Sequence, residues 1–179
     1  MNPASLTTER LQLRAPRMAD LDAVHAIHAD PETNRFNPAG PHRTIEQSRR
    51  LLESWLEHWA GNGFGYWAVE AIAEPGCVIG FGGVVRKSID GRERLNLYFR
   101  FRPSSWGKGF ASEMVEAAKG LAFTNLGYGE IAATVRPDNA PSIRVLERLG
   151  MRRGGEIPDA AGESLLFVLQ ASPGSALGP

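Results

Sequence analysis

The chain has 179 residues, with 20 basic and 20 acidic residues and a formal net charge of zero. This balance gives no broad electrostatic reason to expect binding to nucleic acid or to an anionic membrane. No apolar run is long enough to span a bilayer, the N-terminus lacks the apolar core of a signal peptide, and the single cysteine, Cys77, has no partner for an internal disulfide. We therefore expect one soluble, cytoplasmic domain over residues 1–170 and a disordered tail over residues 171–179.

The first predicted elements are a strand and a short helix. Alternating apolar and polar residues predict a strand over Thr8–Arg14, and apolar residues at helical spacing predict a helix over Met18–Ala29. His25 and His28 lie three positions apart on that helix. Two histidines without a nearby cysteine or an HExxH pattern favour ordinary, partly exposed histidines over a metal site, so we expect no metal.

A loop and a longer helix follow. Three prolines and a glycine within residues 30–43 predict the loop. Thr44 and Gln47 have the spacing of a capping box, which predicts the start of a helix over residues 44–60. The tryptophans of this helix are expected to pack in the core rather than to bind a ligand: Trp55 and Trp59.

The middle of the chain predicts an antiparallel meander of three strands. The first two strands are expected over Phe64–Ala71 and Cys77–Val85, and the glycines of the second suit a crowded place in a sheet. Asp90-Gly91 is a turn signal that returns the chain into a central strand over Leu95–Arg102.

The central strand leads into the most informative stretch of the chain. Pro103 ends the strand because it has no N–H to donate, and apolar residues at helical spacing begin at Phe110. Between them, Trp106–Ala111 has the sequence WGKGFA, whose small residues let a ligand approach the backbone closely. The free N–H groups of a helix's first turn bind anions, phosphate above all. This stretch therefore predicts a pyrophosphate site.

A second informative stretch follows the next strand. Glu130–Val135 is predicted to lie parallel to the central strand, through a right-handed crossover. Asn139 or Ala140 is expected to cap the following helix, and Gly150 to end it. Two strands complete the prediction: Met151–Ile157 and Ser164–Leu169.

These two stretches resemble motifs of the GNAT superfamily of acyl-CoA-dependent N-acetyltransferases. The family's pyrophosphate loop is written Gln/Arg-x-x-Gly-x-Gly/Ala, and Trp106, Gly109 and Ala111 stand at its three marked positions. The tryptophan, together with Asn139-x-x-Ser142, is similar to the Rim-type branch that acetylates ribosomal-protein N-termini. The likeness extends over nearly the whole chain, and the order of elements agrees with it.

The resemblance implies a single mixed α/β (α+β) domain, with a mostly antiparallel sheet, one splayed parallel pair of strands and flanking helices. It implies acetyl-CoA as co-substrate, with the pantetheine arm between the splayed strands and the pyrophosphate on the loop. An amine would attack the thioester directly, without an acyl-enzyme. The residues that the resemblance implies in acetyl-CoA binding are Phe99, Phe101, Trp106, Gly107, Lys108, Gly109, Phe110, Ala111, Asn139 and Ser142.

The resemblance identifies the catalytic acid and base less directly than the residues that bind acetyl-CoA. Many family members have a tyrosine in the last helix as the acid toward the CoA thiolate, and this chain has Leu146 there. The branch it resembles makes Ser142 the candidate acid, or a hydrogen-bond donor to sulfur, although first-turn serines also form local bonds. For the base, Glu70, Glu163 and a chain of waters stay open. The candidate walls of an acceptor cavity are Phe36, Trp67 and Tyr98.

The sequence also bears on other functions. The chain lacks Gly-x-Gly-x-x-Gly, a Gly-Lys-Ser/Thr sequence and a Gly-x-Ser-x-Gly elbow, which argues against dinucleotide, P-loop and serine-hydrolase sites. The alternative from another class is a GNAT-like fold that binds acyl-CoA as a sensor or interaction module without turnover. The acceptor amine is left open between a protein N-terminus, a small metabolite and an antibiotic. A homodimer is compatible with the resemblance, since related enzymes often pair.

Overall fold

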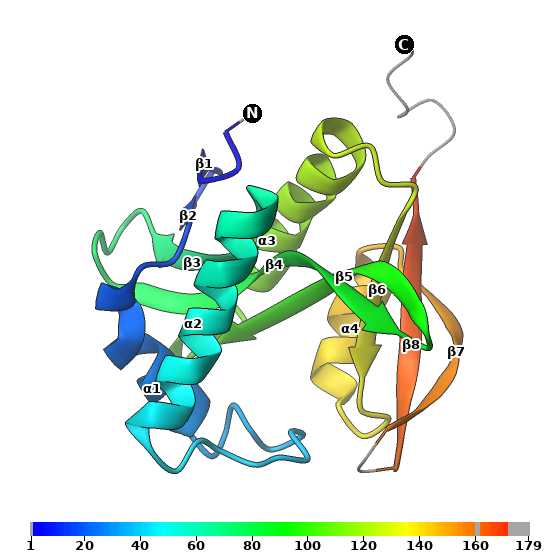
Figure 1. Ribbon diagram of the computed structural model, residues 1–179, viewed down its shortest axis with the longest axis horizontal. Helices are drawn as coiled ribbons and strands as arrows, with labels where there is room; N and C mark the ends of the chain where they lie inside the picture. Colours follow the sequence, from blue (N-terminus) through cyan, green and yellow to red (C-terminus); the bar gives the residue numbers. More distant parts are fainter. Residues whose placement is uncertain (1, 160–161, 172–179) are drawn as a thin grey trace.

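The structure is a computed structural model that describes residues 2–159 and 162–171. All but the first residue of the predicted tail lies outside this range. The elements in chain order, shown in Figure 1, are β1 (Ser5–Thr7), β2 (Leu11–Arg14), a 3-10 turn η1 (Met18–Asp20), α1 (Leu21–Ala29), α2 (Ile45–Asn62), β3 (Tyr66–Ala71), β4 (Val78–Ile89), β5 (Arg92–Phe101), η2 (Pro103–Ser105), α3 (Phe110–Lys119), a π-helical turn η3 (Gly120–Asn125), β6 (Glu130–Val135), α4 (Ala140–Arg148), β7 (Arg152–Asp159) and β8 (Gly162–Gln170).

The described strands form one eight-stranded sheet in the order β1-β2-β3-β4-β5-β6-β8-β7. Neighbouring strands are antiparallel except β5 and β6, which are parallel. In Figure 1 these two strands diverge toward their C-terminal ends. The mixed, mostly antiparallel sheet with one splayed parallel pair is thus confirmed.

The N-terminal strand differs from its prediction. The chain forms a hairpin of β1 and β2 instead of one strand over Thr8–Arg14. The N–H of Thr8 donates to the carbonyl oxygen of Leu11 at 2.9 Å, and this turn reverses the chain before β2 begins. Alternation alone could not locate the turn, because Thr8 and Arg10 also fit the polar positions of a strand.

The predictions for the helix after Thr44 and for the turn at Asp90-Gly91 agree more closely with the structure than the prediction for the N-terminal strand. Gln47 Oε1 accepts the N–H of Thr44 at 3.2 Å, as the capping box predicts. The helix it opens ends at Asn62, two residues later than predicted, where Gly63 takes a left-handed conformation with φ +72°. The turn between β4 and β5 has positive φ at Asp90 (53°) and Gly91 (69°), which suits a tight hairpin and lets both strands extend to it.

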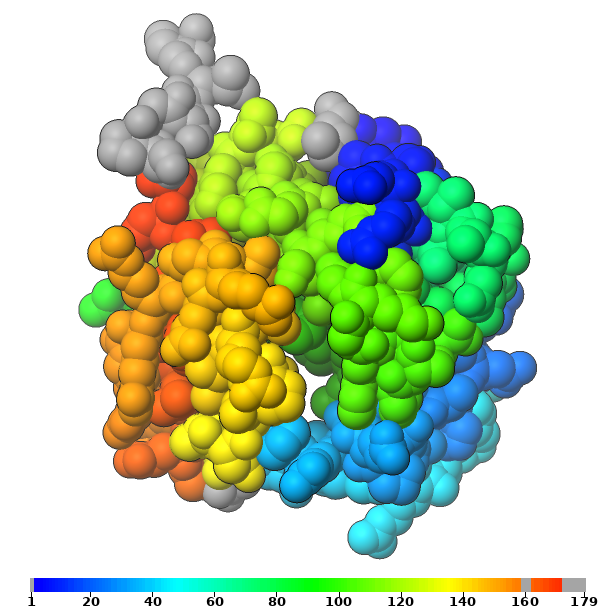
Figure 2. Space-filling view, turned by 180° about the vertical axis from the view of Figure 1, so that it is seen from behind, coloured from blue at the N-terminus to red at the C-terminus, as the bar shows by residue number. Residues whose placement is uncertain are grey.

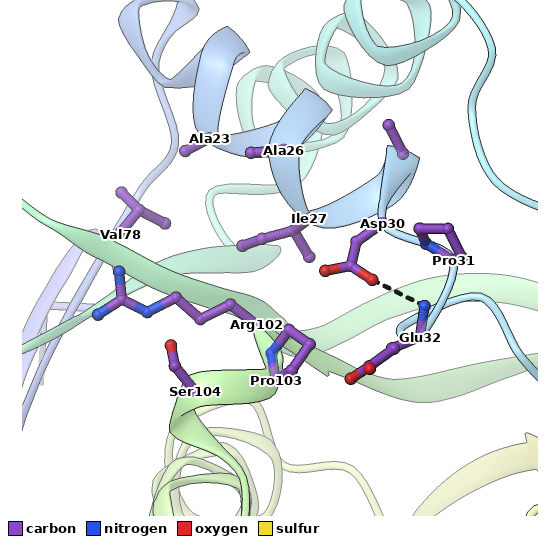
Figure 3. Close-up of a pocket in the computed structure, with 11 residues that line it drawn as sticks. Ala23, Ala26, Ile27, Asp30, Pro31, Glu32, Val78, Arg102, Pro103 and Ser104 are labelled. Atoms are coloured by element: carbon purple, nitrogen blue, oxygen red, sulfur yellow. Dashed lines mark hydrogen bonds between the residues drawn. The ribbon is translucent and has the colours of Figure 1, made fainter.

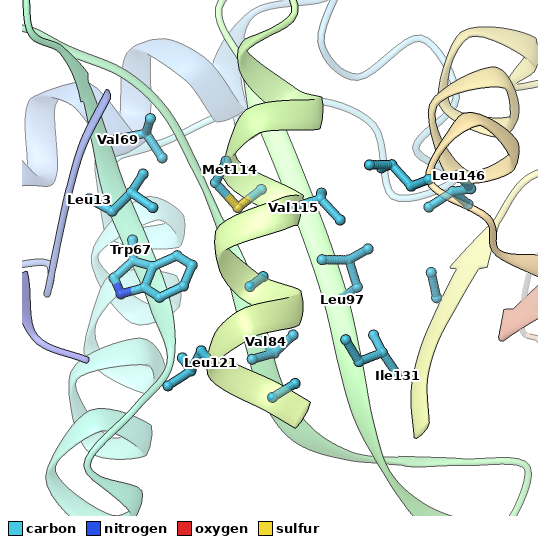
Figure 4. Packing of buried hydrophobic residues seen from close by; sticks show 14 of the residues in the cluster. Leu13, Trp67, Val69, Val84, Leu97, Met114, Val115, Leu121, Ile131 and Leu146 are labelled. Atoms are coloured by element: carbon cyan, nitrogen blue, oxygen red, sulfur yellow. The ribbon is translucent and has the colours of Figure 1, made fainter. Parts of the chain in front are cut away.

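Helices cover both faces of the sheet. One face packs against α3 and α4, and its core includes residues of β3, β5 and β6 together with Met114 and Leu146 (Figure 4). The other face packs against α1 and α2, around Trp55 and Phe81. The crowding predicted for β4 is present: a Cβ at Gly82 would lie 2.7 Å from the carbonyl oxygen of Tyr98. None of the described helices is both long and apolar enough to cross a membrane.

Candidate active site

The loop between β5 and α3 presents a row of backbone donors. Gly107 and Gly109 have left-handed φ values of +72° and +80°, which glycine adopts without strain. Within the described residues, none of the backbone N–H groups from Gly107 to Ser112 donates a hydrogen bond; the next one, of Glu113, bonds to the carbonyl of Gly109. These donors surround the N-terminus of α3, whose dipole favours negative charge. The geometry therefore suits a pyrophosphate.

The turn between β1 and β2 holds this loop in place. The Glu113 carboxylate on α3 accepts hydrogen bonds from the Thr8 hydroxyl (2.6 Å), the Arg10 N–H (2.7 Å) and Arg10 Nε (2.7 Å). Arg10 also donates to the carbonyl oxygen of Lys108 at 2.8 Å. Burial alone would raise the pKa of Glu113, but the bonds from Thr8 and Arg10 outweigh it and lower that pKa. The sequence gives no sign of this contact, because about a hundred residues separate Glu113 from Thr8 and Arg10.

The strands β5 and β6 separate beside this loop. They pair at a single position, Asn96 with Ala132, although both strands continue beyond it. Arg102 donates its N–H to β4, so strand alternation turns the backbone groups of Phe99 and Phe101 toward the gap. The gap therefore offers backbone donors and acceptors to an extended ligand.

Trp106 closes one end of the gap. Its indole Nε1 donates to the carbonyl oxygen of Phe101 at 2.7 Å, while 49% of the residue stays exposed. The Phe101 carbonyl is thus already engaged, and the free groups of this edge are centred on Phe99. Phe101 itself is buried, with its side chain in the core.

The start of α4 forms the other side of the gap. Asn139 is the helix cap, and its side-chain oxygen accepts the N–H of Ser142 at 3.2 Å. Ser142 is half-buried, and its hydroxyl makes no hydrogen bond to any described residue. Leu146 is only 2% exposed and packs in the core, so it has no access to a ligand (Figure 4). Figure 2 shows a hollow bounded by the yellow α4 region, the green segment after β5 and the light-blue loop after α1.

A cavity of about 270 Å³ lies on the opposite face of the sheet, where α1, the α1–α2 loop and α2 cover β5. We call it the acceptor cavity, after the role proposed for it below. Its walls combine aromatic rings, two imidazoles and one guanidinium: His28, Asn37, His42, Leu51, Trp55, Tyr66, Tyr98 and Arg100. Tyr98 is the one predicted wall residue among them. Trp67 instead lies fully buried, with its indole donating to the carbonyl of Pro3.

His28 is a fixed, neutral imidazole in this cavity. Its Nδ1 lies 2.9 Å from the carbonyl oxygen of Val24, and its Nε2 lies 2.9 Å from the Tyr98 hydroxyl. Because a carbonyl can only accept, Nδ1 carries the proton and Nε2 accepts from Tyr98. Burial, reinforced by the charge of Arg100, lowers the pKa of His28 to about 3. The predicted partly exposed histidine is therefore wrong for His28, which is 3% exposed.

His42 comes from the α1–α2 loop and stacks on His28, with ring centroids 5.3 Å apart. Its Nδ1 lies 2.9 Å from the hydroxyl of Ser48, which also lies 2.9 Å from Nδ1 of His25. Burial, followed by the charge of Arg100 and by His25, lowers the pKa of His42. Its Nε2 makes no hydrogen bond to any described residue, so this nitrogen is free to act on a ligand.

Glu70 does not present a free carboxylate. One oxygen accepts from Arg14 Nε at 2.7 Å, and the other accepts from the N–H of Gly76 at 2.8 Å. Arg14 also pairs with Asp20, at 2.7 Å. The geometry therefore favours a structural role for Glu70 and argues against its use as a base. Glu163 is exposed at the beginning of β8.

A second hollow, of about 990 Å³, lies between α1, the beginning of β4 and η2 (Figure 3). Small side chains of α1 form one wall, and Arg102 with Pro103 forms the other. The Arg102 guanidinium is paired with Glu74 at 2.9 Å. This hollow is broader than the acceptor cavity, which is lined by aromatic and imidazole rings next to the strand that separates from β6.

The described residues contain no group of three or more His, Cys, Asp or Glu side chains that could hold a metal ion. The polar groups around the gap are instead backbone donors, a half-buried serine and an asparagine. This set suits a ligand with phosphate groups and an extended amide-containing arm.

Comparisons with known proteins agree with this geometry. A family model described as an acetyltransferase (GNAT) domain matches residues 10–152. An uncharacterised N-acetyltransferase of Bacillus licheniformis, p20, is 31% identical over 87% of this chain and 86% of its own length. An acetyltransferase (GNAT family) structure from Bacillus anthracis has 27% identity and a TM-score of 0.76, covering 93% of this chain and 98% of its own. The fold is also that of a spermidine N-acetyltransferase from Vibrio cholerae, solved with CoA and spermine (20% identity, TM-score 0.72, 91% and 96% coverage).

Proposed function

The chain belongs to the GNAT acetyltransferase family, and we propose that it transfers an acetyl group from acetyl-CoA to a primary amine held in the acceptor cavity. The family assignment makes the protein an acetyl-CoA-dependent N-acetyltransferase. The observation that carries the finer proposal is the row of free N–H groups from Gly107 to Ser112, placed beside strands that pair at one position only.

In this proposal the free backbone N–H groups from Gly107 to Ser112 bind the pyrophosphate of acetyl-CoA. Trp106 flanks this row, because its own N–H donates to the carbonyl oxygen of Pro103 at 3.0 Å. The pantetheine arm lies in the gap and pairs with backbone groups of Phe99, with Asn139 and Ser142 on its other side. Support comes from strand alternation, which turns the Phe99 N–H and carbonyl into the gap, and from the free hydroxyl of Ser142. The thioester then lies between the gap and the acceptor cavity.

The reaction needs two proton transfers. The amine nitrogen attacks the thioester carbonyl carbon, a C–N bond forms, the C–S bond breaks, and the amine loses a proton while the sulfur gains one. We assign the first transfer to Nε2 of His42, which is available when Nδ1–H donates to Ser48 and Ser48 donates to His25. Ser142 is the proposed donor to the CoA sulfur.

The likeness to the branch that acetylates ribosomal-protein N-termini stays a prediction. It rests on the WGKGFA sequence and on Asn139-x-x-Ser142. A homodimer likewise stays a prediction. The site does not require it, because the described residues of a single chain supply the loop, the gap and the acceptor cavity.

Calorimetric titration with acetyl-CoA tests the proposal, using the wild type and Gly109→Glu. A Cβ at Gly109 would lie 3.3 Å from Arg10 Nη2, at a residue whose φ of +80° favours glycine. The substitution should therefore distort the loop and place a negative charge beside the pyrophosphate site, so binding should be lost. Gly127→Glu is the matched control, because Gly127 has a similar left-handed φ of +69° and open space around a Cβ. It should bind acetyl-CoA as the wild type does. If the wild type fails to bind acetyl-CoA, the proposal is withdrawn.

A further inference from the structure

Arg100 is the charged group of the acceptor cavity. Among the described residues that line this cavity, none is Asp or Glu. Arg100 forms no ion pair with any described residue, whereas its neighbours along the chain, Arg94 and Arg102, pair with Glu130 and Glu74. The half-buried Arg100 guanidinium therefore faces this cavity without a carboxylate to balance its charge.

Buried Asn34 holds Arg100 in position. The side-chain oxygen of Asn34 accepts from Arg100 Nη1 at 2.7 Å and from Asn37 Nδ2 at 2.9 Å. Its amide nitrogen donates to the carbonyl oxygens of His28 and Asp30, both at 2.8 Å, and the residue is only 4% exposed. One nitrogen of the guanidinium is thereby fixed, and its central carbon lies 5.9 Å from the centre of the Tyr98 ring. Its other N–H groups have no hydrogen-bond partner among the described residues.

Besides the Tyr98 ring, no ionised group among the described residues that line the cavity balances this charge. His28 and His42 are the nearby titratable groups of α1 and of the α1–α2 loop, and burial lowers the pKa of both, so both are neutral at pH 7. The hydroxyls of Tyr66 and Tyr98 also stay protonated, because burial raises their pKa values. The cavity therefore carries one positive charge on an otherwise neutral, largely aromatic surface.

We propose that Arg100 binds a carboxylate of the acceptor, and that the acceptor is a small amino acid-like amine with an apolar side chain. This inference rests on the proposed function and adds the substrate class. Arg is suited to such a contact because its remaining N–H groups can donate two parallel bonds to a carboxylate. Leu51, Trp55 and Tyr66 supply the apolar surface for the side chain.

Two other acceptor classes fit this cavity less well. A polyamine would bring positive charge next to Arg100 and would meet no lining carboxylate among the described residues. A protein N-terminus has its first carboxyl group in a peptide bond, so it offers Arg100 no charge from the backbone. A free carboxylate close to the amine satisfies both the charge and the volume of about 270 Å³.

The test compares each acid with its amide. Acetylation of L-leucine and L-phenylalanine is measured against leucinamide, phenylalaninamide and spermidine, with rates corrected for the fraction of free amine. We expect kcat/KM to favour the acids by about 10- to 100-fold, as for a charge-assisted pair. Arg100→Gln should remove this preference. The matched control Arg86→Gln, which removes one charge from an exposed site on β4, should keep it.

Binding to the CoA complex separates this inference from catalysis. N-acetyl-leucine and N-acetyl-leucinamide are titrated calorimetrically into wild type and Arg100→Gln, each saturated with CoA. Tighter binding of the acid that depends on Arg100 supports the carboxylate site even if no amine is turned over, in which case the proposed transfer fails alone. Equal binding of acid and amide, no binding of either, a preference for spermidine, or an unchanged preference in Arg100→Gln overturns the inference while leaving acetyl-CoA binding intact.

Discussion

The two faces of the sheet build the two halves of the candidate active site from different groups. On the α3 and α4 face, the main feature is a run of free backbone N–H groups within one short segment, Gly107–Ser112. On the α1 and α2 face, the acceptor cavity is built from side chains that five separate parts of the chain bring together. The first half can be recognised in a motif, whereas the second exists only once the chain has folded.

Because of this difference, the two halves should tolerate different amino-acid substitutions. A backbone site depends on the conformation of its glycines and tolerates change in most side chains around it. A side-chain site depends on each residue that lines it. Single substitutions should therefore affect acceptor chemistry strongly while leaving acetyl-CoA binding nearly unchanged, and the following predictions test that separation.

The largest effect is expected for His42→Gln. Removing the proposed base should lower kcat/KM by about 100-fold or more, with the acetyl-CoA dissociation constant unchanged. Steady-state kinetics and calorimetry measure the two quantities on the same protein. His58→Gln is the matched control, because His58 lies on α2, which covers the same face of the sheet, but does not line the acceptor cavity. A loss of activity below threefold would refute the role of His42.

The pH dependence sharpens this test. Because the pKa of His42 is lowered, its neutral form persists to a more acidic pH than that of an ordinary histidine. The ratio of wild-type to His42→Gln rates should be flat at pH 7 and above, and should decrease as the pH falls through a value below 6.5. Using the ratio cancels the titration of the acceptor amine. A ratio independent of pH down to 5 would contradict the proposal.

The contrast between the two faces explains which parts of the molecule the sequence could predict. Most elements and the loop follow from periodicity, turn residues and a local motif, and the splayed pair follows from the family resemblance that the motifs carry. Glu70 shows the limit, because alternation along β3 could not reveal that Arg14 and Gly76 occupy its carboxylate. Arg100 was likewise only a polar position of a strand, since Asn34 and the cavity reach it through tertiary contacts.

A smaller effect is expected on the other face, from Ser142→Ala. The hydroxyl is proposed to donate to a CoA thiolate, which is already a good leaving group, so kcat should fall by about tenfold. Acetyl-CoA should still bind, because the Ser142 N–H to Asn139 contact does not need the hydroxyl. Ser88→Ala, at an exposed position of β4, is the control. An unchanged kcat would leave Ser142 as part of the helix cap and nothing more.

The smallest effect is one of stability, through His28. Its pKa is about 3 in the folded protein and near 6.5 when unfolded, so unfolding takes up a proton between these values. The stability present above pH 6.5 is therefore lost progressively as the pH falls toward 3, at about 1.4 kcal/mol per pH unit. His28→Gln keeps an acceptor for the Tyr98 hydroxyl but removes this titration. Urea unfolding at pH 5.5, 5.0 and 4.5 gives the free energy of unfolding at each pH, and this free energy should change less steeply with pH in the variant. Equal dependence on pH in the two proteins would mean that His28 is protonated beside Arg100 in the folded protein.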